Sequence, residues 1–498
     1  MKDYLPHIPG FINDTINSLH YFRPELALTC GFLLVIIADL FFKKIYSLPF
    51  YITLLCFFAV GFYTIQQLHT APANLFSGMI IIDHLGALFK LIFLLAGLLF
   101  IFFLKNNRQF IAHNKGTGDI FSILLAVILG MNLMAMTSNL LMLYISIEMV
   151  SIGSYLMVGY ISKDTRQTEG AMKYIIFGSV CSAIMLYGLS LMYGFTGTLD
   201  LNNPQFIQEL SRIPSLASGT VIIMVLTGIG FKLSVVPFHF WSPDVYEGAP
   251  TPVSAFLSTG PKAAGFAILV KFISAFQLNT DPEIKDMLSI LNHVLIIAAI
   301  ASMIAGNFGA IRQNNAKRML AYSSIGHTGF LLMAVIAFSE TGFKALIFYL
   351  FIYVIMNMAA FMLINEAEEI TGSESVEDYK GLGKHYPVLM ICFVVVLVSL
   401  TGLPPTAGFT AKFLVFSSAV EIYQSSGSFW ILLLMITGAI TTLVSLFYYF
   451  KIPLNAFIRS SNKLIQVKKY SQLMPICIVL SVALLLLLLL PQIITSFI

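Results

Sequence analysis

The chain has 498 residues, of which 58% are hydrophobic and only 10% are charged, and its formal net charge is +4. Soluble globular proteins carry about 25% charged residues. The composition therefore excludes a water-soluble protein and indicates an integral membrane protein. A separate soluble domain would need long polar surface segments, and the sequence has none, so we expect one membrane domain over residues 1–498.

Apolar stretches between polar breaks predict an all-α polytopic membrane protein, because a helix needs about twenty apolar residues to cross the bilayer. The first 24 residues lack the basic, apolar and small-residue order of a cleaved signal, so the first span is expected to remain in the fold. About fourteen helices are predicted, at 25–42, 48–68, 78–103, 119–137, 139–161, 168–195, 217–239, 252–276, 287–310, 317–339, 343–365, 386–420, 428–451 and 472–497.

Basic residues are distributed unevenly between the two sets of loops. The loops after odd-numbered helices hold sixteen: Lys43, Lys44, Lys105, Arg108, Lys115, Lys163, Arg166, Arg312, Lys317, Arg318, Lys380, Lys384, Arg459, Lys463, Lys468 and Lys469. The termini and the other loops hold Lys2, Arg23, Arg212 and Lys285. Cytoplasmic loops of membrane proteins are enriched in Lys and Arg. The uneven distribution therefore predicts that the loops after odd-numbered helices are cytoplasmic and that both termini lie on the opposite side.

No motif for a cofactor is present in the sequence. The five cysteines lie far apart, without C-x-x-C spacing or a nearby cluster of histidines, as expected for small buried hydrophobic residues. Glycine-rich nucleotide and phosphate loops are also missing. We therefore expect this chain to hold no metal, nucleotide or redox centre.

Four ionisable residues fall deep inside predicted spans: Glu148, Lys232, Lys262 and Lys412. A charge at mid-bilayer costs roughly 2.5–3.5 kcal/mol on insertion scales. Three lysines cannot all pair with one glutamate, so water or proton exchange must handle part of this cost. A Glu148–Lys232 pair that changes protonation when its contact breaks suits a proton relay, whereas a static pair would only fix helix packing.

Other polar residues in the spans have both structural and functional interpretations. Glu169 and Lys173 are four residues apart, in the favourable order for a helix ion pair. His239 and His327 lie among small and hydroxyl residues and can pass a proton or simply fill the core. Four lysines near span ends are expected to reach the lipid headgroups: Lys90, Lys271, Lys344 and Lys451. Lys271 is also a candidate for the exit of a proton path.

Prolines break two of the predicted helices. Pro237 removes the amide that would bond the Leu233 carbonyl, beside Lys232, and Pro404 and Pro405 do the same for Leu400 and Thr401. Free carbonyls at membrane depth persist only where they are buried in protein or line water. The sequence therefore predicts a hydrated cavity beside each broken helix.

The breaks lie in helices 7 and 12, five helices apart. A five-helix unit repeated in tandem is inverted, because five is odd, and many ion-coupled transporters use this symmetry. The predicted organisation is helices 1–3 in 25–118, a first repeat of helices 4–8 in 119–276, a second repeat of helices 9–13 in 287–451 and helix 14 in 472–497. The match is imperfect, since Lys232 precedes its proline whereas Lys412 follows its prolines.

The run FHFWSPDVYEGAPTPVSAFLSTGPKAAGF, at 238–266, resembles the segment between helices 7 and 8 of the antiporter-like membrane subunits of respiratory complex I. The segments KYIIFGS, NAKRMLAYSSIGHTGF and LTGLPPTAGFTAKF follow in the order of that family. The resemblance extends over the whole chain. It implies a non-redox subunit of a proton-pumping oxidoreductase, in a bacterial inner membrane, with both termini on the periplasmic side.

The resemblance also implies roles for the buried charges. Glu148 and Lys232 become a coupled ion pair, Lys262 a relay residue and Lys412 the terminal lysine of a second half-channel. NADH, flavin, iron–sulfur clusters and quinone would belong to partner subunits, and the partners would be a neighbouring antiporter-like subunit and small membrane subunits.

Two other functions stay open. An Mrp-type cation/proton antiporter subunit uses similar motifs without a quinone reaction, although the Mrp counterpart is expected to carry a glutamate at the place of Lys412. A structural scaffold, in which the charges only set helix register, is the third possibility.

Overall fold

The computed structural model describes residues 8–492 apart from 43–44, 46, 112–116, 162–163, 277–281, 461–469 and 490. Seven of the loop lysines behind the predicted orientation lie outside the described residues: Lys43, Lys44, Lys115, Lys163, Lys463, Lys468 and Lys469. Residues 1–7 and 493–498 also lie outside the described residues.

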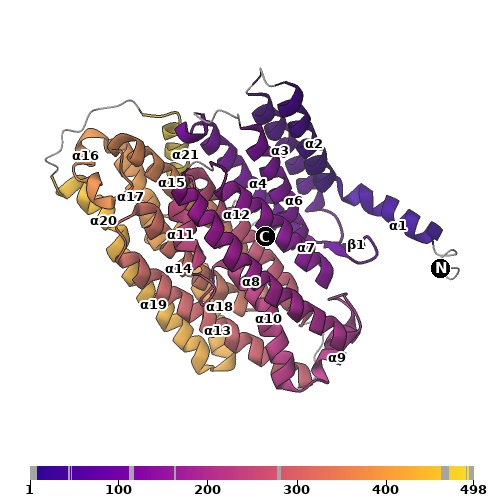
Figure 1. The fold of residues 1–498 in the computed structure, drawn as a ribbon. Coiled ribbons are helices and arrows are strands. Elements are labelled where there is room, and N and C mark those ends of the chain that lie inside the picture. The colour runs from indigo at the N-terminus through magenta and orange to yellow at the C-terminus, as the bar shows by residue number, and fades with distance from the viewer. Residues whose placement is uncertain are drawn as a thin grey trace.

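The N-terminal part contains three long helices, a short hairpin and two smaller helices. Figure 1 shows it in indigo and violet at one end of the bundle, with α1 pointing away from the other helices. Its elements are α1 (Ile8–Tyr21), α2 (Arg23–Phe41), α3 (Leu48–Gln67), β1 (Ala73–Leu75), β2 (Ile80–Ile82), α4 (His84–Lys105) and α5 (Arg108–Ile111).

The middle part contains five membrane helices, of which the fourth is broken. Its elements are α6 (Gly118–Met136), α7 (Leu140–Val158), α8 (Thr165–Thr196), α9 (Pro204–Ser211), α10 (Ser215–Leu233), α11 (Trp241–Gly248) and α12 (Thr251–Ala275). The break separates α10 from α11.

The last part repeats this order and adds one helix, and it forms the orange and yellow end of the bundle (Figure 1). Its elements are α13 (Pro282–Ile311), α14 (Ala316–Ile336), α15 (Glu340–Thr371), the short helix η2 (Val376–Tyr379), α16 (Leu382–His385), α17 (Pro387–Thr401), α18 (Ala407–Ser426), α19 (Phe429–Tyr449), α20 (Lys451–Pro453), η3 (Leu454–Ile458) and α21 (Met474–Leu489). Here the break separates α17 from α18.

The predicted membrane fold is confirmed. Within the described residues, twelve helices are long and apolar enough to cross a membrane, and two shorter apolar helices are α17 and α21. Together they account for the fourteen predicted spans, with helices 7 and 12 broken. The predicted start that differs most from the structure is that of the span at 78–103, whose first residues include β2. Its helix starts at His84, where the Asp83 side chain accepts a hydrogen bond from the Gly86 amide.

The two five-helix units share detailed backbone features. The Leu140 amide donates to the Leu199 carbonyl at 2.8 Å, and the Ala316 amide donates to the Glu374 carbonyl at 2.9 Å. These bonds tie the start of the second helix to the loop after the third in each unit. That third helix, α8 or α15, has 32 residues in both units and ends at a left-handed glycine. The backbone thus supports the repeat that the proline breaks predict.

Each break also begins in the same way. The last helical residue is followed by a residue with left-handed backbone, Ser234 (φ 56°) in the first unit and Gly402 (φ 79°) in the second. A proline, Pro237 or Pro405, comes three residues later in both.

The N-terminal helices hold a buried ion pair. Lys90 of α4 lies 2.8 Å from Glu25 of α2, and the two side chains are 1% and 0% exposed. Gln67 accepts a second hydrogen bond from Lys90 at 2.9 Å, and Asn132 donates to Glu25 at 3.0 Å. The prediction that Lys90 reaches the headgroups is therefore wrong, because a buried carboxylate holds it inside the bundle.

We predict that Lys90→Met destabilises the protein strongly, because Glu25 would stay buried without a counter-charge. Breaking one partner of a buried pair costs about 3–5 kcal/mol. Thermal unfolding of the detergent-solubilised protein measures the change, and Lys344→Met is the matched control, since Lys344 pairs with Glu340 at the exposed start of α15. Equal effects of the two substitutions would contradict the prediction, and adding Glu25→Leu should recover much of the loss.

Candidate functional site

Glu148 and Lys232 lie on facing helices but do not touch. Glu148 of α7 is half-buried and accepts a 2.6 Å hydrogen bond from Ser182 of α8. Lys232, in the last turn of α10, is 3% exposed and donates to Ser151 of α7 at 3.3 Å. Among the ion pairs of the described residues, none joins Glu148 to Lys232. The predicted direct pair is thus replaced by two hydrogen bonds to serines.

The break after Lys232 frees a carbonyl, as the sequence predicts. Helix α10 ends at Leu233, four residues before Pro237. The Leu233 carbonyl accepts a 3.1 Å hydrogen bond from the hydroxyl of Thr328 on α14. The freed acceptor therefore binds a side chain of the second unit.

Lys262 of α12 is held on the same helix α14. It is 1% exposed, and its ammonium donates to the Ser324 carbonyl at 2.9 Å, the Ser324 hydroxyl at 2.5 Å and the Thr328 hydroxyl at 2.9 Å. An ammonium has three protons to donate, so its hydrogen-bonding capacity is used entirely by neutral oxygen atoms. Thr328 thereby contacts both Lys262 and the α10 break.

Tyrosines of α15 and α19 form hydrogen bonds with two neighbouring parts of α14. Tyr353 donates to the Ser324 hydroxyl at 2.9 Å. His327, which is 4% exposed, lies 2.8 Å from the Tyr349 hydroxyl through Nδ1 and 3.2 Å from the Tyr449 hydroxyl through Nε2. A neutral imidazole donates through one nitrogen and accepts through the other, so His327 can connect the two tyrosines.

Lys412 occupies the second break. It lies on α18, is 5% exposed and donates to the Thr401 carbonyl at 2.9 Å, a carbonyl that the following prolines free. Its ammonium also lies 4.5 Å from the centre of the Phe330 ring, a cation–π contact. A Cβ on Gly402 would meet the Lys412 side chain at 2.5 Å, so glycine is needed for this approach as well as for its left-handed backbone.

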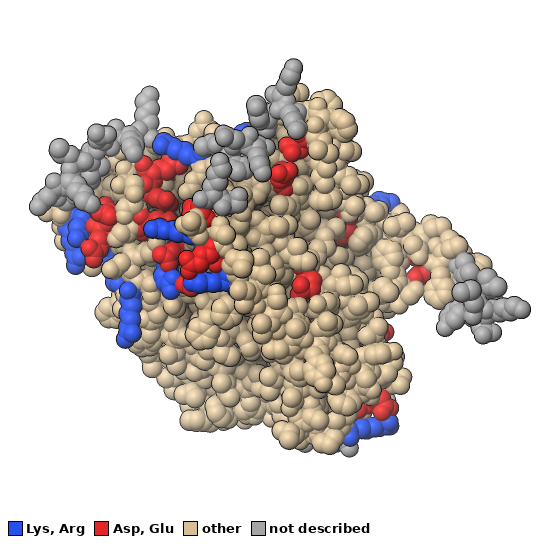
Figure 2. Space-filling view, viewed as in Figure 1, with Lys and Arg blue, Asp and Glu red and all other residues tan. Residues whose placement is uncertain are grey.

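A charged network lies at the end of the bundle where α8 begins. Lys173 pairs with Glu169 at 2.9 Å, as predicted, and with Asp244 of α11 at 2.7 Å. Arg318 of α14 binds Asp244 at 2.6 Å and Glu247 at 2.8 Å. These residues surround a cavity of about 320 Å³, and Figure 2 shows basic and acidic side chains gathered at one end of the face.

Two opposing effects act on Asp244 in this network. Partial burial raises the pKa of its carboxyl group, but hydrogen bonds from Lys173 and Arg318 outweigh that effect and hold the pKa below its usual range. Asp244 therefore stays ionised and joins α8, α11 and α14. The sequence did not predict this role, although the DVYEG run placed two acids next to the broken helix.

The remaining candidate residues, Lys271 and His239, lie outside the hydrogen-bonded clusters on α14. Lys271 forms an ion pair with Asp83 at the start of α4. The ring of the buried His239 lies against Phe240, with ring centres 4.3 Å apart. Among the described residues, no three His, Cys, Asp or Glu side chains gather as metal ligands would.

Several residues that bond to these candidates were not predicted from the sequence. They are Ser151, Ser182, Ser324, Thr328, Tyr349, Tyr353 and Tyr449. The spacing of Ser324, Thr328, Tyr349 and Tyr353 was a usable signal, since residues four apart share one face of a helix.

Comparison with known proteins shows the family. The family model described as "NADH:quinone oxidoreductase/Mrp antiporter, TM" matches residues 137–442. The chain is 40% identical over 464 residues to NADH-quinone oxidoreductase subunit N 2 of Chloroherpeton thalassium, covering 91% of this chain and 89% of the relative.

Solved structures show the same fold. A chain of respiratory complex I from Thermus thermophilus with bound aureothin is 28% identical, with a TM-score of 0.77 and coverage of 95% of this chain and 98% of that chain. A chain of the Mrp complex from Dietzia sp. is 20% identical, with a TM-score of 0.73 and coverage of 97% and 96%, which shows a shared fold alone. The chain belongs to the NADH:quinone oxidoreductase/Mrp antiporter family of membrane proteins.

Proposed function

We propose that this chain is subunit N of a proton-pumping NADH:quinone oxidoreductase and that it relays protons through its buried polar residues. The subunit assignment is supported by relatives named as subunit N that are 38–40% identical over about nine tenths of the chain. In the same proposal, residues 119–276 and 287–451 are the two inverted repeats, residues 25–118 hold helices 1–3, and helix 14 spans 472–497.

The observation that carries the proposal is a pair of hydrogen-bonded clusters on α14, of which one reaches α10, α12 and α15 and the other reaches α15 and α19. The first cluster joins the Leu233 carbonyl, next to Lys232, to Thr328, Lys262 and Ser324. The second joins Tyr349, His327 and Tyr449. Hydroxyl, imidazole and ammonium groups each both hold and release protons, so a proton can pass between neighbours within each cluster. Fully buried charges are costly in a membrane, and this cost is tolerated at functional sites.

Movement of Glu148 would control Lys232. An approaching carboxylate stabilises the charged ammonium, whereas a carboxylate held on Ser182 leaves that ammonium with only the Ser151 hydroxyl. Ser151 lies three residues from Glu148 on α7, so both side chains point toward the same side of that helix. In this proposal Lys262 receives the proton next, and Lys412, at the second break, ends the path. Glu169, Lys173, His239, His327 and Lys271 are proposed as secondary relay residues.

Energy for this transport must come from other subunits. Moving one charge across the membrane costs roughly 2.3 kcal/mol per 100 mV, and the sequence carries no motif for a redox group. We therefore propose that NADH, flavin, iron–sulfur clusters and quinone react in partner subunits, and that the chain is a translocase subunit without its own redox site. The proposed membrane partners are the antiporter-like subunit M and small subunits such as K and J.

We predict that Lys232→Ala and Lys412→Ala each abolish most proton translocation while the complex still assembles. A positioned group that transfers a proton contributes about 10²–10⁴-fold in rate, so we expect a fall of about a hundredfold. NADH-driven pumping in inverted membrane vesicles measures the rate, blue-native gels measure assembly, and Lys344→Ala is the control at an exposed lysine.

The outcome separates the three functions. Undiminished pumping in an assembled Lys232→Ala complex would contradict the relay. Loss of assembly, with normal pumping by the complexes that remain, would instead support the scaffold. Transport that shifts with sodium and needs no NADH would support an Mrp-type antiporter, whose structural likeness to this chain is limited to the fold.

We also propose that the protein lies in a bacterial inner membrane with both termini on the periplasmic side, as the sixteen basic residues in the odd loops favour. Single cysteines at two exposed positions test this orientation. They are Gln208, in α9 after the membrane helix α8, and Glu377, in η2 after the membrane helix α15. A membrane-impermeant maleimide applied from the periplasmic side should label Gln208→Cys and spare Glu377→Cys. The reverse labelling pattern would show the opposite orientation.

A further inference from the structure

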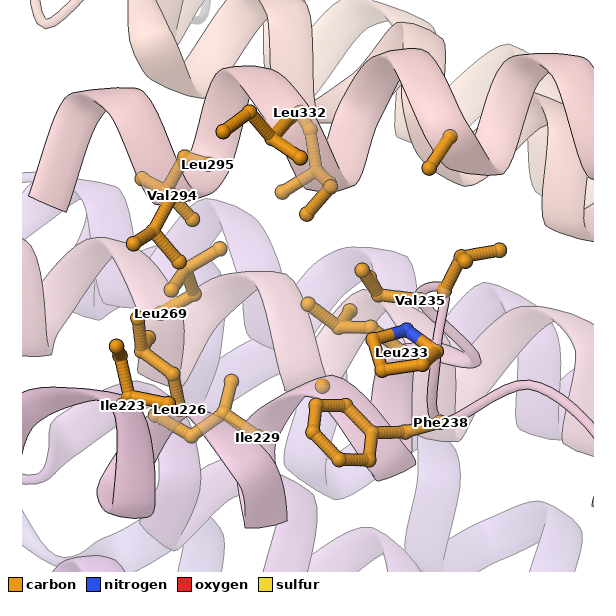
Figure 3. A pocket seen from close by; sticks show the side chains of 16 residues that line it. Ile223, Leu226, Ile229, Leu233, Val235, Phe238, Leu269, Val294, Leu295 and Leu332 are labelled. Carbon is orange, nitrogen blue, oxygen red and sulfur yellow. The ribbon is translucent and has the colours of Figure 1, made fainter. Parts of the chain in front are cut away.

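An apolar crevice lies between the two five-helix units, beside the α10 break (Figure 3). Its volume is about 380 Å³. Ile223 of α10 and Ile297 of α13 form its mouth and are 45% and 54% exposed, whereas its floor contains Leu233 of α10 and Leu332 of α14. In Figure 3 the labelled side chains from both units point toward one another across an empty space. The crevice therefore opens on the outer, lipid-facing surface of the chain.

The crevice lies against irregular backbone that a membrane protein has to protect. The segment between α10 and α11 is partly uncovered, since Pro237 is exposed and Phe240 is 63% exposed. Irregular backbone at membrane depth is not tolerated in direct contact with lipid unless its polar groups are satisfied. Something apolar must therefore cover this segment without demanding hydrogen bonds from it.

Several polar groups of the break are satisfied by hydrogen bonds within the protein. The Val235 amide donates to the Gly230 carbonyl at 2.9 Å, and the Val236 amide donates to the Ser302 hydroxyl at 3.0 Å. The Leu233 carbonyl is bound by Thr328. What remains on the crevice side is hydrocarbon, from Val235, Val236 and Phe238. Water in such a space would find too few polar partners to be retained.

We propose that the crevice binds one acyl chain of a membrane phospholipid. A methylene group takes up roughly the volume of a water molecule, about 30 Å³, so the crevice holds about a dozen methylenes. That length is most of one acyl chain, and acyl chains surround every part of a membrane protein. The mouth between two exposed isoleucines gives a chain access from the bilayer. This inference goes beyond proton transport and does not depend on it.

A bound acyl chain would seal the first break on its lipid side. Leu233, at the floor of the crevice, follows Lys232 directly, and Leu233 also packs against Gly265 of α12, close to the Lys232 side chain. Hydrocarbon in the crevice thus keeps water and ions from reaching the lysine from the membrane side, while the hydrogen-bonded face of α10 stays open toward α7 and α14.

Photocrosslinking on the intact complex tests this proposal. Membranes carrying a phosphatidylethanolamine with a diazirine in its acyl chain are solubilised, washed in detergent to remove loosely held lipid and then irradiated, and adducts are mapped by mass spectrometry. We expect adducts at Phe238 and Ile297 to form in the washed complex, because lipid in the crevice is retained during washing. Adducts at Val180 and Tyr187, exposed on the outer face of α8, should be lost.

Substitutions that fill the crevice give the decisive comparison. Ala298→Phe with Ala301→Phe places two rings in the crevice and should remove the retained adducts. Ile304→Phe is the matched control, because Ile304 lies on the same helix, is 43% exposed and is not part of the crevice lining. Equal loss of adducts at Phe238 and Val180 in the washed complex, or adducts at Phe238 that persist unchanged in the double variant, would overturn the proposal.

Discussion

Three buried lysines, Lys232, Lys262 and Lys412, are held by neutral oxygen atoms of serine, threonine and backbone groups. In a membrane interior this is a costlier way to keep a charge than pairing it with a carboxylate, because neutral hydroxyl and carbonyl groups compensate an ammonium only partly. The Lys90–Glu25 pair shows that the same chain can bury a lysine with a carboxylate partner. The two arrangements fit different tasks, since a paired lysine fixes helices and an unpaired lysine can gain or lose a proton.

The broken helices supply carbonyl acceptors close to these lysines, and one of them, Thr401, binds Lys412 directly. In a continuous helix each carbonyl already accepts one bond from within the helix, as the Ser324 carbonyl of α14 does from Thr328 while it also binds Lys262. The two units share the left-handed residue and the proline but use the freed carbonyl differently. Thr401 holds Lys412 directly, whereas Leu233 reaches Lys262 through Thr328. The imperfect alignment of the two lysines in the sequence thus has a structural reason, because Lys412 lies after its break and Lys232 lies before its own.

Much of the fold was predictable because the length of an apolar stretch and the position of a proline determine local structure. The fourteen spans, both breaks and the burial of the three lysines follow from segments of about twenty residues. The hairpin β1–β2 was missed, since an apolar run such as Met79–Ile82 resembles the start of a helix until the Asp83 cap is recognised. The pairing of Lys90 was also missed, because Glu25 lies 65 residues earlier and no local pattern connects them. The relay roles of the four buried charges stay predictions.

The contacts of α14 decide how the site is connected, and they could not be read from the sequence. Ser324, His327 and Thr328 lie on a helix of the second unit, yet they bind Lys262 of the first unit and the carbonyl at its break. Asp244 and Arg318 join the same two units at one end of the bundle. One helix of the second unit thus touches both breaks, through Thr328 at the first and Phe330 at the second.

Thr328→Val tests the central claim that this helix connects Lys262 to the α10 break. The substitution keeps the shape of the side chain and removes the hydroxyl. One hydrogen bond is worth about 1–1.5 kcal/mol, so we expect proton translocation per NADH oxidised to fall about tenfold in an assembled complex. Thr441→Val is the control, because the buried Thr441 hydroxyl bonds only within its own helix. Unchanged translocation in Thr328→Val, equal to that of Thr441→Val, would contradict the proposed connection.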